Sequence, residues 1–434
     1  MGFAGHYLAR HVVTSKIDHP PAKNFWQTIV IPCLDEPALT GSLESLWLCD
    51  RPSCAVEVII VINSPEDAPD DILESNLDTL KKAERWARDH NEPGFTFHVL
   101  YEPSLPAKYA GPGLARKTGM DQAILRFNLL DRPGGVIVSF DADTTCKTDY
   151  LVEIERTFTE TPGLTGCNIY FEHPVQGKQF PGQVYRAITE YELHLRYYIE
   201  AIRHTGFPYA YHTIGSAFCV TAAAYVSQGG MNRRKAGEDF YFLQKIIPVG
   251  RFTEINSTCV YPSPRPSGRV PFGTGAVIKK YVEGRIKAID TYHPDAFGGL
   301  KKLFAQPSEW FGLDNSEVEK KFSSLPETVR DFTGKEFILK IGEIKSNCAT
   351  PESFTRRFWQ WFNMFRILKY LNFVHTKYYA RVPVREAAKI FLEGEGYGAF
   401  GDRDEKGLLG IFRKIQREGK YEIRNSESRE SRPA

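Results

Sequence analysis

What this sequence lacks already excludes several classes of protein. The formal net charge of its 434 residues is only +2, so no strong basic field draws it to nucleic acid, and we expect no nucleic-acid partner. No stretch approaches the roughly 20 uninterrupted apolar residues that a membrane-spanning helix needs. His6 and Arg10 interrupt the N-terminal residues, which leaves no signal-peptide core. These absences predict a cytoplasmic protein.

The eight cysteines include no Cys-x-x-Cys pair, which removes the usual zinc and dithiol patterns. Several stand inside apolar runs, so we expect buried thiols in a reducing compartment rather than a disulfide framework. The chain is longer than one hydrophobic core usually organises. We therefore expect a catalytic domain over residues 1–284 and a mainly helical region over 285–434, whose end from Arg417 to Ala434 reads as disordered.

Apolar runs alternate with helical patterns through the first half of the chain. This alternation predicts an α/β fold with a doubly wound, mostly parallel mixed sheet and a helical C-terminal appendage. Ligands of such folds bind beyond the carboxyl ends of the strands. The expected strands of this half are 28–32, 56–62, 95–101 and 136–140, with helices that include 70–90 and 114–127.

An acidic pair, Asp141 and Asp143, directly follows the expected strand 136–140. Carboxylates at positions i and i+2 can face one hard cation where the chain bends, and oxygen ligands suit Mg²⁺ or Mn²⁺. The alternative is that both residues only turn the chain and cap a helix. Asp35 and Glu36 follow the first strand, and Asn63 follows the second, so polar groups converge at the same edge of the sheet.

Three further groups of residues are candidates for the chemistry. Arg116 lies in a glycine-containing loop, 111–119, that can present cations and backbone amides to an anion, or can be a plain flexible turn. Glu238 and Asp239 stand at an expected helix start, where one of them can act as general base or merely cap the helix. Arg265 and Arg269 lie in a proline-rich loop and can clamp a diphosphate, or remain solvated.

An aromatic and basic stretch, residues 356–369, has an amphipathic character. It can lie on the inner face of a membrane or against a lipid-linked acceptor. The alternative, which the pattern favours, is packing of the helical appendage.

Taken in order, these segments resemble the family 2 glycosyltransferases, which have a GT-A fold. The resemblance spans residues 28–239, about half of the chain. The segments that carry it are Thr28 to Glu36, Val56 to Ile62, Gly113 to Gly119, Ser139 to Asp143, Gly229 to Met231 and Gly237 to Asp239.

The resemblance implies transfer of a sugar from a nucleotide-diphosphate donor of UDP or GDP type to a carbohydrate or lipid-linked acceptor, with inversion and with Mn²⁺ or Mg²⁺. Asp35 and Glu36 would lie by the base and ribose, Asp141 by the ribose or metal, and Asp143 on the metal. Asp239 would be the base. The donor site would also include the remaining matched or nearby positions Pro32, Asn63, Arg116, Arg265 and Arg269.

Two departures from the family pattern bear on this expectation. Asn63-Ser64 stands where many members have an acid, which leaves the identity of the nucleotide base open. The chain also has no Gln-x-x-Arg-Trp motif, so a non-processive enzyme is expected. The alternatives are a sugar nucleotidyltransferase and an inactive nucleotide-sugar-binding scaffold protein.

Overall fold

The computed structural model describes residues 2–398 and 400–418 of the chain. It divides into two compact units. The first comprises Met1–Ile188 and Thr213–Val282, and the second comprises Thr189–His212 and the described residues from Glu283 onward. Helix α6 (Gly182–His204) contributes to both units.

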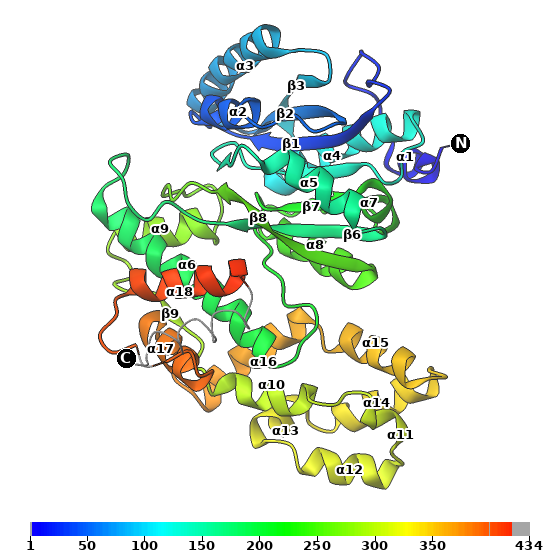
Figure 1. The fold of residues 1–434 in the computed structure, drawn as a ribbon, viewed down its shortest axis with the longest axis vertical. Helices are drawn as coiled ribbons and strands as arrows, with labels where there is room; N and C mark the ends of the chain where they lie inside the picture. The colour runs from blue at the N-terminus through cyan, green and yellow to red at the C-terminus, as the bar shows by residue number, and fades with distance from the viewer. Residues whose placement is uncertain (1, 399, 419–434) are drawn as a thin grey trace, which may run out of the picture. The chain divides into compact units, whose positions relative to one another are not determined.

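An eight-stranded mixed sheet forms the centre of the first unit, in the order β3-β2-β1-β4-β7-β6-β8-β5 (Figure 1). The first four strands of this order are parallel to one another, while β7 is antiparallel to both β4 and β6. The predicted fold class is therefore confirmed. The strands are β1 (Phe25–Cys33), β2 (Ala55–Pro65), β3 (Phe95–Leu105), β4 (Val136–Ser139), β5 (Thr145–Cys146), β6 (Leu164–Phe171), β7 (Phe218–Thr221) and β8 (Arg251–Tyr261).

Helices cover both faces of the parallel half of this sheet. Gly119 of α4 packs on Val30 and Val61, whereas Trp47 of α2 and Trp86 of α3 meet Phe97 on the opposite face. The helices of this unit, besides the first part of α6, are α1 (Gly5–His11), α2 (Leu39–Trp47), α3 (Asp70–His90), α4 (Pro112–Leu129), α5 (Tyr150–Glu160), α7 (Ala222–Ser227), α8 (Glu238–Ile246), the 3₁₀ turn η1 (Ile247–Val249) and α9 (Thr274–Val282).

The strand order reverses between β1 and β4. The chain moves from β1 to β2 and β3 in one direction, and α4 then carries it back to the other side of β1. At such a reversal the connections leave in opposite directions and open a crevice beyond the strand ends. The segments after β1 and after β4 lie at this reversal, and we call the region beyond these two strand ends the crevice.

Three local expectations were wrong. Gly113 and Gly119 lie inside α4 rather than in a loop, because each lets the helix approach a neighbour that a Cβ would strike. Asn63 and Ser64 lie inside β2 rather than beyond it, because the pairing with β3 continues to Pro65. Strand β8 was missed, because its buried positions do not alternate regularly.

The second unit is helical and has an aromatic core. The rings of Phe358, Trp359 and Phe362, from the stretch that we considered for membrane contact, are at most 7% exposed. Trp359 and Phe362 meet Phe304 edge to face at 5.0 and 5.2 Å. These rings build the core of this unit, and no helix among the described residues is both long enough and apolar enough to cross a membrane.

The last helix of the second unit is held to α6 by charged and polar side chains. Arg413 donates two 2.9 Å bonds to Glu192, and Gln416 donates to Glu200 at 3.0 Å. Arg417 and Glu418 end this helix, contrary to the expected disorder, and residues 419–434 lie outside the described residues. The elements of this unit are β9 (Asp290–Thr291), α10 (Ala296–Phe304), α11 (Glu309–Gly312), α12 (Asn315–Ser323), α13 (Glu327–Thr333), α14 (Glu336–Ser346), α15 (Pro351–Trp361), α16 (Met364–Lys377), β10 (Val382–Pro383), α17 (Val384–Gly394) and α18 (Glu405–Glu418).

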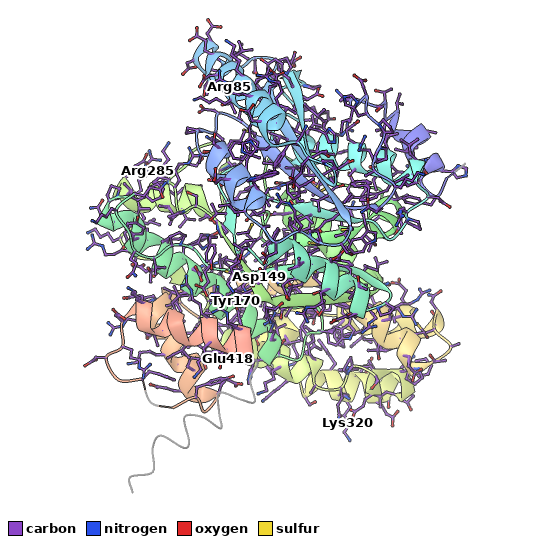
Figure 2. All side chains as sticks on the ribbon, turned by 45° about the horizontal axis from the view of Figure 1, so that its top comes forward. Arg85, Asp149, Tyr170, Arg285, Lys320 and Glu418 are labelled. Atoms are coloured by element: carbon purple, nitrogen blue, oxygen red, sulfur yellow. The ribbon has the colours of Figure 1, made fainter. Side chains whose placement is uncertain are left out.

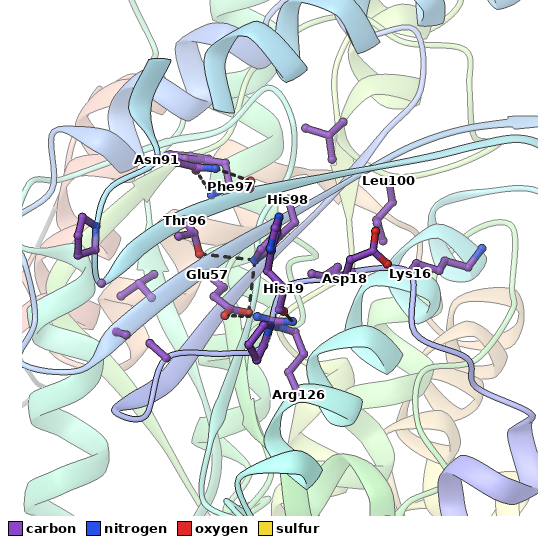
Figure 3. Close-up of a pocket in the computed structure, with 18 residues that line it drawn as sticks. Lys16, Asp18, His19, Glu57, Asn91, Thr96, Phe97, His98, Leu100 and Arg126 are labelled. Atoms are coloured by element: carbon purple, nitrogen blue, oxygen red, sulfur yellow. Dashed lines mark hydrogen bonds and ion pairs between the residues drawn. The ribbon is translucent and has the colours of Figure 1, made fainter. Parts of the chain in front are cut away.

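A buried ion pair ties α4 to the sheet beside a hollow of about 490 Å³ (Figure 3). Arg126 of α4 donates from Nη2 to Glu57 of β2 at 2.6 Å and from Nε to its second oxygen, and both side chains are about 5% exposed. The third nitrogen of Arg126 donates to the carbonyl of His19 at 2.8 Å. The pair is therefore bidentate and shielded from water.

We expect Arg126→Met to lower the free energy of unfolding by about 3 kcal/mol, because it leaves the Glu57 carboxylate buried without its cation. Urea unfolding measures this loss. The double variant Glu57→Leu/Arg126→Met removes both charges and should recover most of it. If Arg126→Met were as stable as the parent, the ion pair would contribute nothing to the free energy of unfolding.

Candidate active site

The turn that carries Asp141 and Asp143 is pinned to the strand ends. The amide of Phe140 donates to the carbonyl of Val30 at 3.1 Å, which continues the β1–β4 ladder, and Thr144 closes the turn on the carbonyl of Asp141 at 3.1 Å. Ser42 of α2 donates to the carbonyl of Ala142 at 2.8 Å. Asp141 and Asp143 therefore belong to a turn that is fixed just beyond the ends of β1 and β4.

Arg116, in the second turn of α4, joins this turn to the start of α8. Its guanidinium donates to Asp141 at 2.5 Å, to Ser139 at 2.7 Å and to Glu238 at 3.2 Å, and its side chain is only 4% exposed. Burial alone would lower the pKa of Arg116, but the two carboxylates raise it above its usual value. The arginine is a fixed charge between two acidic segments.

Asp239 lies beside this arginine at the N-terminus of α8. Gly237, with φ of 66°, turns the chain into the helix, and the amide of Phe240 donates to the Asp239 carboxylate at 2.7 Å. Burial, followed by the charge of Glu238, raises the pKa of Asp239 to about 7. The carboxylate is therefore poised to change its protonation state near neutral pH.

Gly215 leaves room for these groups. A Cβ on Gly215 would lie 2.7 Å from Nη2 of Arg116 and 3.2 Å from Oδ2 of Asp239. The carbonyl of Gly215 also accepts a 2.7 Å bond from Ser139, which in turn accepts from Arg116. Sequence reasoning missed both Gly215 and Ser139, since neither residue type signals such a role without its neighbours.

A second ionic cluster surrounds Glu36. Arg265 donates to the Glu36 carboxylate, Arg269 donates to it at 2.9 Å, and Arg265 also lies 3.9 Å from Asp143. Arg269 additionally donates to the carbonyl of Asp35. The structure thus brings the proline-rich loop onto the first strand end, where both arginines are engaged with protein groups rather than solvated.

Asp35 is held in an unusual backbone conformation by α3. Its φ is 47°, its amide donates to Asn76 Oδ1 at 2.9 Å, and its carboxylate accepts from Ser75 at 2.7 Å. Asn76 also donates to the carbonyl of Asn63 at 3.0 Å, which links the ends of β1 and β2. Ser75 and Asn76 were not predicted, because they lie inside a helix about 40 residues from Asp35 in sequence.

The remaining predicted residue, Pro32, lies inside β1, half-buried and in register with Val61. Lys117, a neighbour of Arg116, turns instead to Asp121 at 2.9 Å and to Tyr7 at 2.7 Å. The hollow of Figure 3 is lined by the first halves of β2 and β3, and its lining includes none of the predicted site residues. The crevice at the strand ends is therefore the candidate site.

The crevice offers oxygen ligands of the kind that hard cations take. Burial, followed by the charges of Asp141 and Glu36, raises the pKa of Asp143 to about 7, although Arg265 opposes the shift. A divalent cation would relieve this repulsion. The buried hydroxyl of Thr144 has no hydrogen-bond partner among the described residues. No group of three or more His, Cys, Asp or Glu forms a metal cluster there, but Mg²⁺ commonly binds one or two carboxylates plus substrate phosphates.

Comparisons with known proteins give distant likenesses only. No family model and no curated protein matches the chain. Among solved structures, residues 1–349 of S. aureus TarS in complex with UDP-GlcNAc are 14% identical with a TM-score of 0.40, covering 76% of this chain and 89% of that one. The mannosyltransferase PcManGT from Pyrobaculum calidifontis, in complex with GDP-Man and Mn²⁺, is 14% identical with a TM-score of 0.37, covering 95% and 93%. At these values we argue the function from the geometry of the site.

We expect Gly215→Ala to lower the free energy of unfolding by about 2 kcal/mol, because the new methyl group displaces Arg116 from its carboxylates. Denaturant unfolding measures the change. Gly41→Ala in α2 is the matched control, since a Cβ there meets nothing within 4 Å, and it should leave stability equal or higher. Equal effects of both substitutions would show that the contact at Gly215 is not tight.

Proposed function

We propose that the chain is a metal-dependent glycosyltransferase that moves a sugar from a nucleotide-diphosphate donor to an acceptor hydroxyl, with inversion and without processivity. One observation carries the proposal. Arg116 holds Asp141, at the end of β4, and Glu238, beside Asp239, in one buried ionic unit at the strand-order reversal. A donor site and a candidate base therefore share the same crevice, within the predicted domain 1–284.

In the proposed reaction, Asp239 accepts the proton of the acceptor hydroxyl as its oxygen attacks the anomeric carbon of the sugar. The bond from that carbon to the diphosphate oxygen breaks, and the nucleoside diphosphate leaves with the electron pair. A carboxylate with a pKa near the working pH suits this role, because it is both ionised and basic enough. Glu238 and Arg116 position Asp239 and tune its charge.

Asp143, with Asp141, would hold a Mg²⁺ or Mn²⁺ ion, which neutralises charge on the diphosphate when it is bound. Asp141 has one oxygen on Arg116, which leaves the other for the metal or the ribose. Asp35, Glu36 and Asn63 would line the nucleoside side of the donor. These roles extend those implied by the sequence and rest on the placement of the residues at one edge of the sheet.

Arg265 and Arg269 are proposed to exchange partners when the donor binds. Both now donate hydrogen bonds to the Glu36 carboxylate, and Arg265 also lies 3.9 Å from the Asp143 carboxylate. A guanidinium fork matches phosphate oxygens as well as carboxylate oxygens. The proline-rich loop would thus close on the diphosphate and release Asp143.

Thermal-shift measurements test the donor site. We expect UDP or GDP to stabilise the chain more strongly with Mn²⁺ than without it. Asp143→Asn should remove the increment due to Mn²⁺, because the metal loses its main ligand, while Asp239→Asn should keep it. A sugar nucleotidyltransferase would instead consume a nucleoside triphosphate and release pyrophosphate. An inactive scaffold would bind nucleotide with no increment from the metal, and either result contradicts the proposal.

The pH dependence of turnover tests the base. The raised pKa of Asp239, about 7, means that its carboxylate is protonated below neutrality. At saturating Mn²⁺, kcat/KM should therefore fall about tenfold per unit as the pH drops below 7. Glu238→Gln removes a negative neighbour and should move this inflection to lower pH. A profile that is flat between pH 5 and about 8 would exclude Asp239 as the base.

A further inference from the structure

A group of exposed cations lies next to the candidate base. Lys108 is in the loop between β3 and α4, and Arg233, Arg234 and Lys235 are in the loop that precedes α8. We call these residues the basic cluster. All are exposed, and within the described part of the chain none of their side chains has a carboxylate partner. Cations gathered without acids leave a local positive potential that an anion can neutralise.

Aromatic rings hold the two arginines of the basic cluster. The guanidinium of Arg233 lies 4.6 Å from the ring centre of Tyr109, and that of Arg234 lies 3.6 Å from the ring centre of Tyr241. Lys108 lies near the same ring as Arg233, with its Nζ 5.3 Å from the ring centre of Tyr109. A guanidinium over a ring keeps N–H groups that point away from the ring available. The two rings thus restrain Arg233 and Arg234 at the surface.

The two loops of the basic cluster touch each other and lead into the site. A Cβ on Gly111 would lie 3.0 Å from the Cα of Lys235, and Gly113 abuts the carbonyl of Arg234. Asn232, in the same loop, donates to the carbonyl of Glu238 at 2.8 Å. One loop runs into α4, which carries Arg116, and the other runs into α8, which carries Asp239. The basic cluster therefore flanks the carboxylate that we assign to the acceptor hydroxyl.

We propose that the basic cluster binds a phosphate group of the acceptor, so that the substrate is a phosphorylated glycan or polyol whose hydroxyl reaches Asp239. This inference rests on the proposed function. The diphosphate of the donor has its own arginines, Arg265 and Arg269, on the β1 side of the crevice. Guanidinium forks match the oxygens of a phosphate, because each offers two parallel N–H donors. The basic cluster thus selects the acceptor by charge.

The test uses fluorescently labelled inorganic polyphosphate, with binding followed by anisotropy at fixed ionic strength and in the presence of saturating UDP and Mn²⁺. We expect Arg233→Gln/Arg234→Gln to weaken binding about tenfold or more, as loss of charge-assisted bonds implies. The matched control is Arg85→Gln/Arg88→Gln, which removes two exposed arginines of α3, one of them labelled in Figure 2, and should change nothing. Glycerol 3-phosphate should displace the probe, whereas glycerol should not.

Three outcomes would overturn the assignment. Equal binding by the parent and the double variant would show that the basic cluster takes no phosphate. Probe binding that is seen without UDP but is absent in saturating UDP would place the probe in the donor site. Binding to phosphatidylglycerol vesicles, but not to polyphosphate, would mean that the basic cluster meets a lipid surface. Failure of UDP and GDP to stabilise the chain, with polyphosphate binding intact, would instead count against the proposed function alone.

Discussion

The site depends on one buried cation. Arg116 lies on α4, the helix that crosses from one half of the sheet to the other, and its guanidinium bonds to acids from two segments that are far apart in sequence. A guanidinium removed from water is costly unless it is paired and hydrogen-bonded, and here each of its three nitrogens donates one bond, to Glu238, Ser139 and Asp141. If Arg116 were displaced, the strand-end turn and the start of α8 would repel each other. The bonds of Arg116 therefore contribute to local stability and also hold the strand-end turn and the start of α8 together.

The buried carboxylates of the site repel one another. The pKa values of Asp143 and Asp239 are both raised to about 7, first by burial and then by neighbouring acids. Such clustering of raised values is typical of functional sites, because a structural cluster would be more stable with fewer acids. In the proposed reaction, a divalent cation beside Asp143 would offset the repulsion from its neighbouring acids, and proton uptake would remove the charge of Asp239. The two acids thus have different proposed roles despite their similar pKa shifts.

The elements were more predictable from the sequence than the contacts. Continuous β-branched runs identify β1 and β2, and the acids after β1 and β4 converge because parallel strands end at one edge. Chain topology could not be derived in the same way, since the antiparallel β7 and the irregular β8 carry weak signals. The pairing of Arg265 with Glu36 spans most of the first unit, so no local pattern encodes it. Gly113 looked like part of a phosphate loop, but its real constraint is the backbone of another loop.

The most direct measurement is ³¹P NMR of a panel of UDP- and GDP-sugars incubated with the protein, Mn²⁺ and phosphorylated polyol acceptors. The account predicts that one donor loses its diphosphate ester signals and yields free UDP or GDP. Asp239→Asn, which keeps the fold and the metal ligands, should slow this release by about a thousandfold or more, as expected for removal of a general base. Release of nucleoside diphosphate at the same rate by Asp239→Asn, or no release from any donor, would contradict the account.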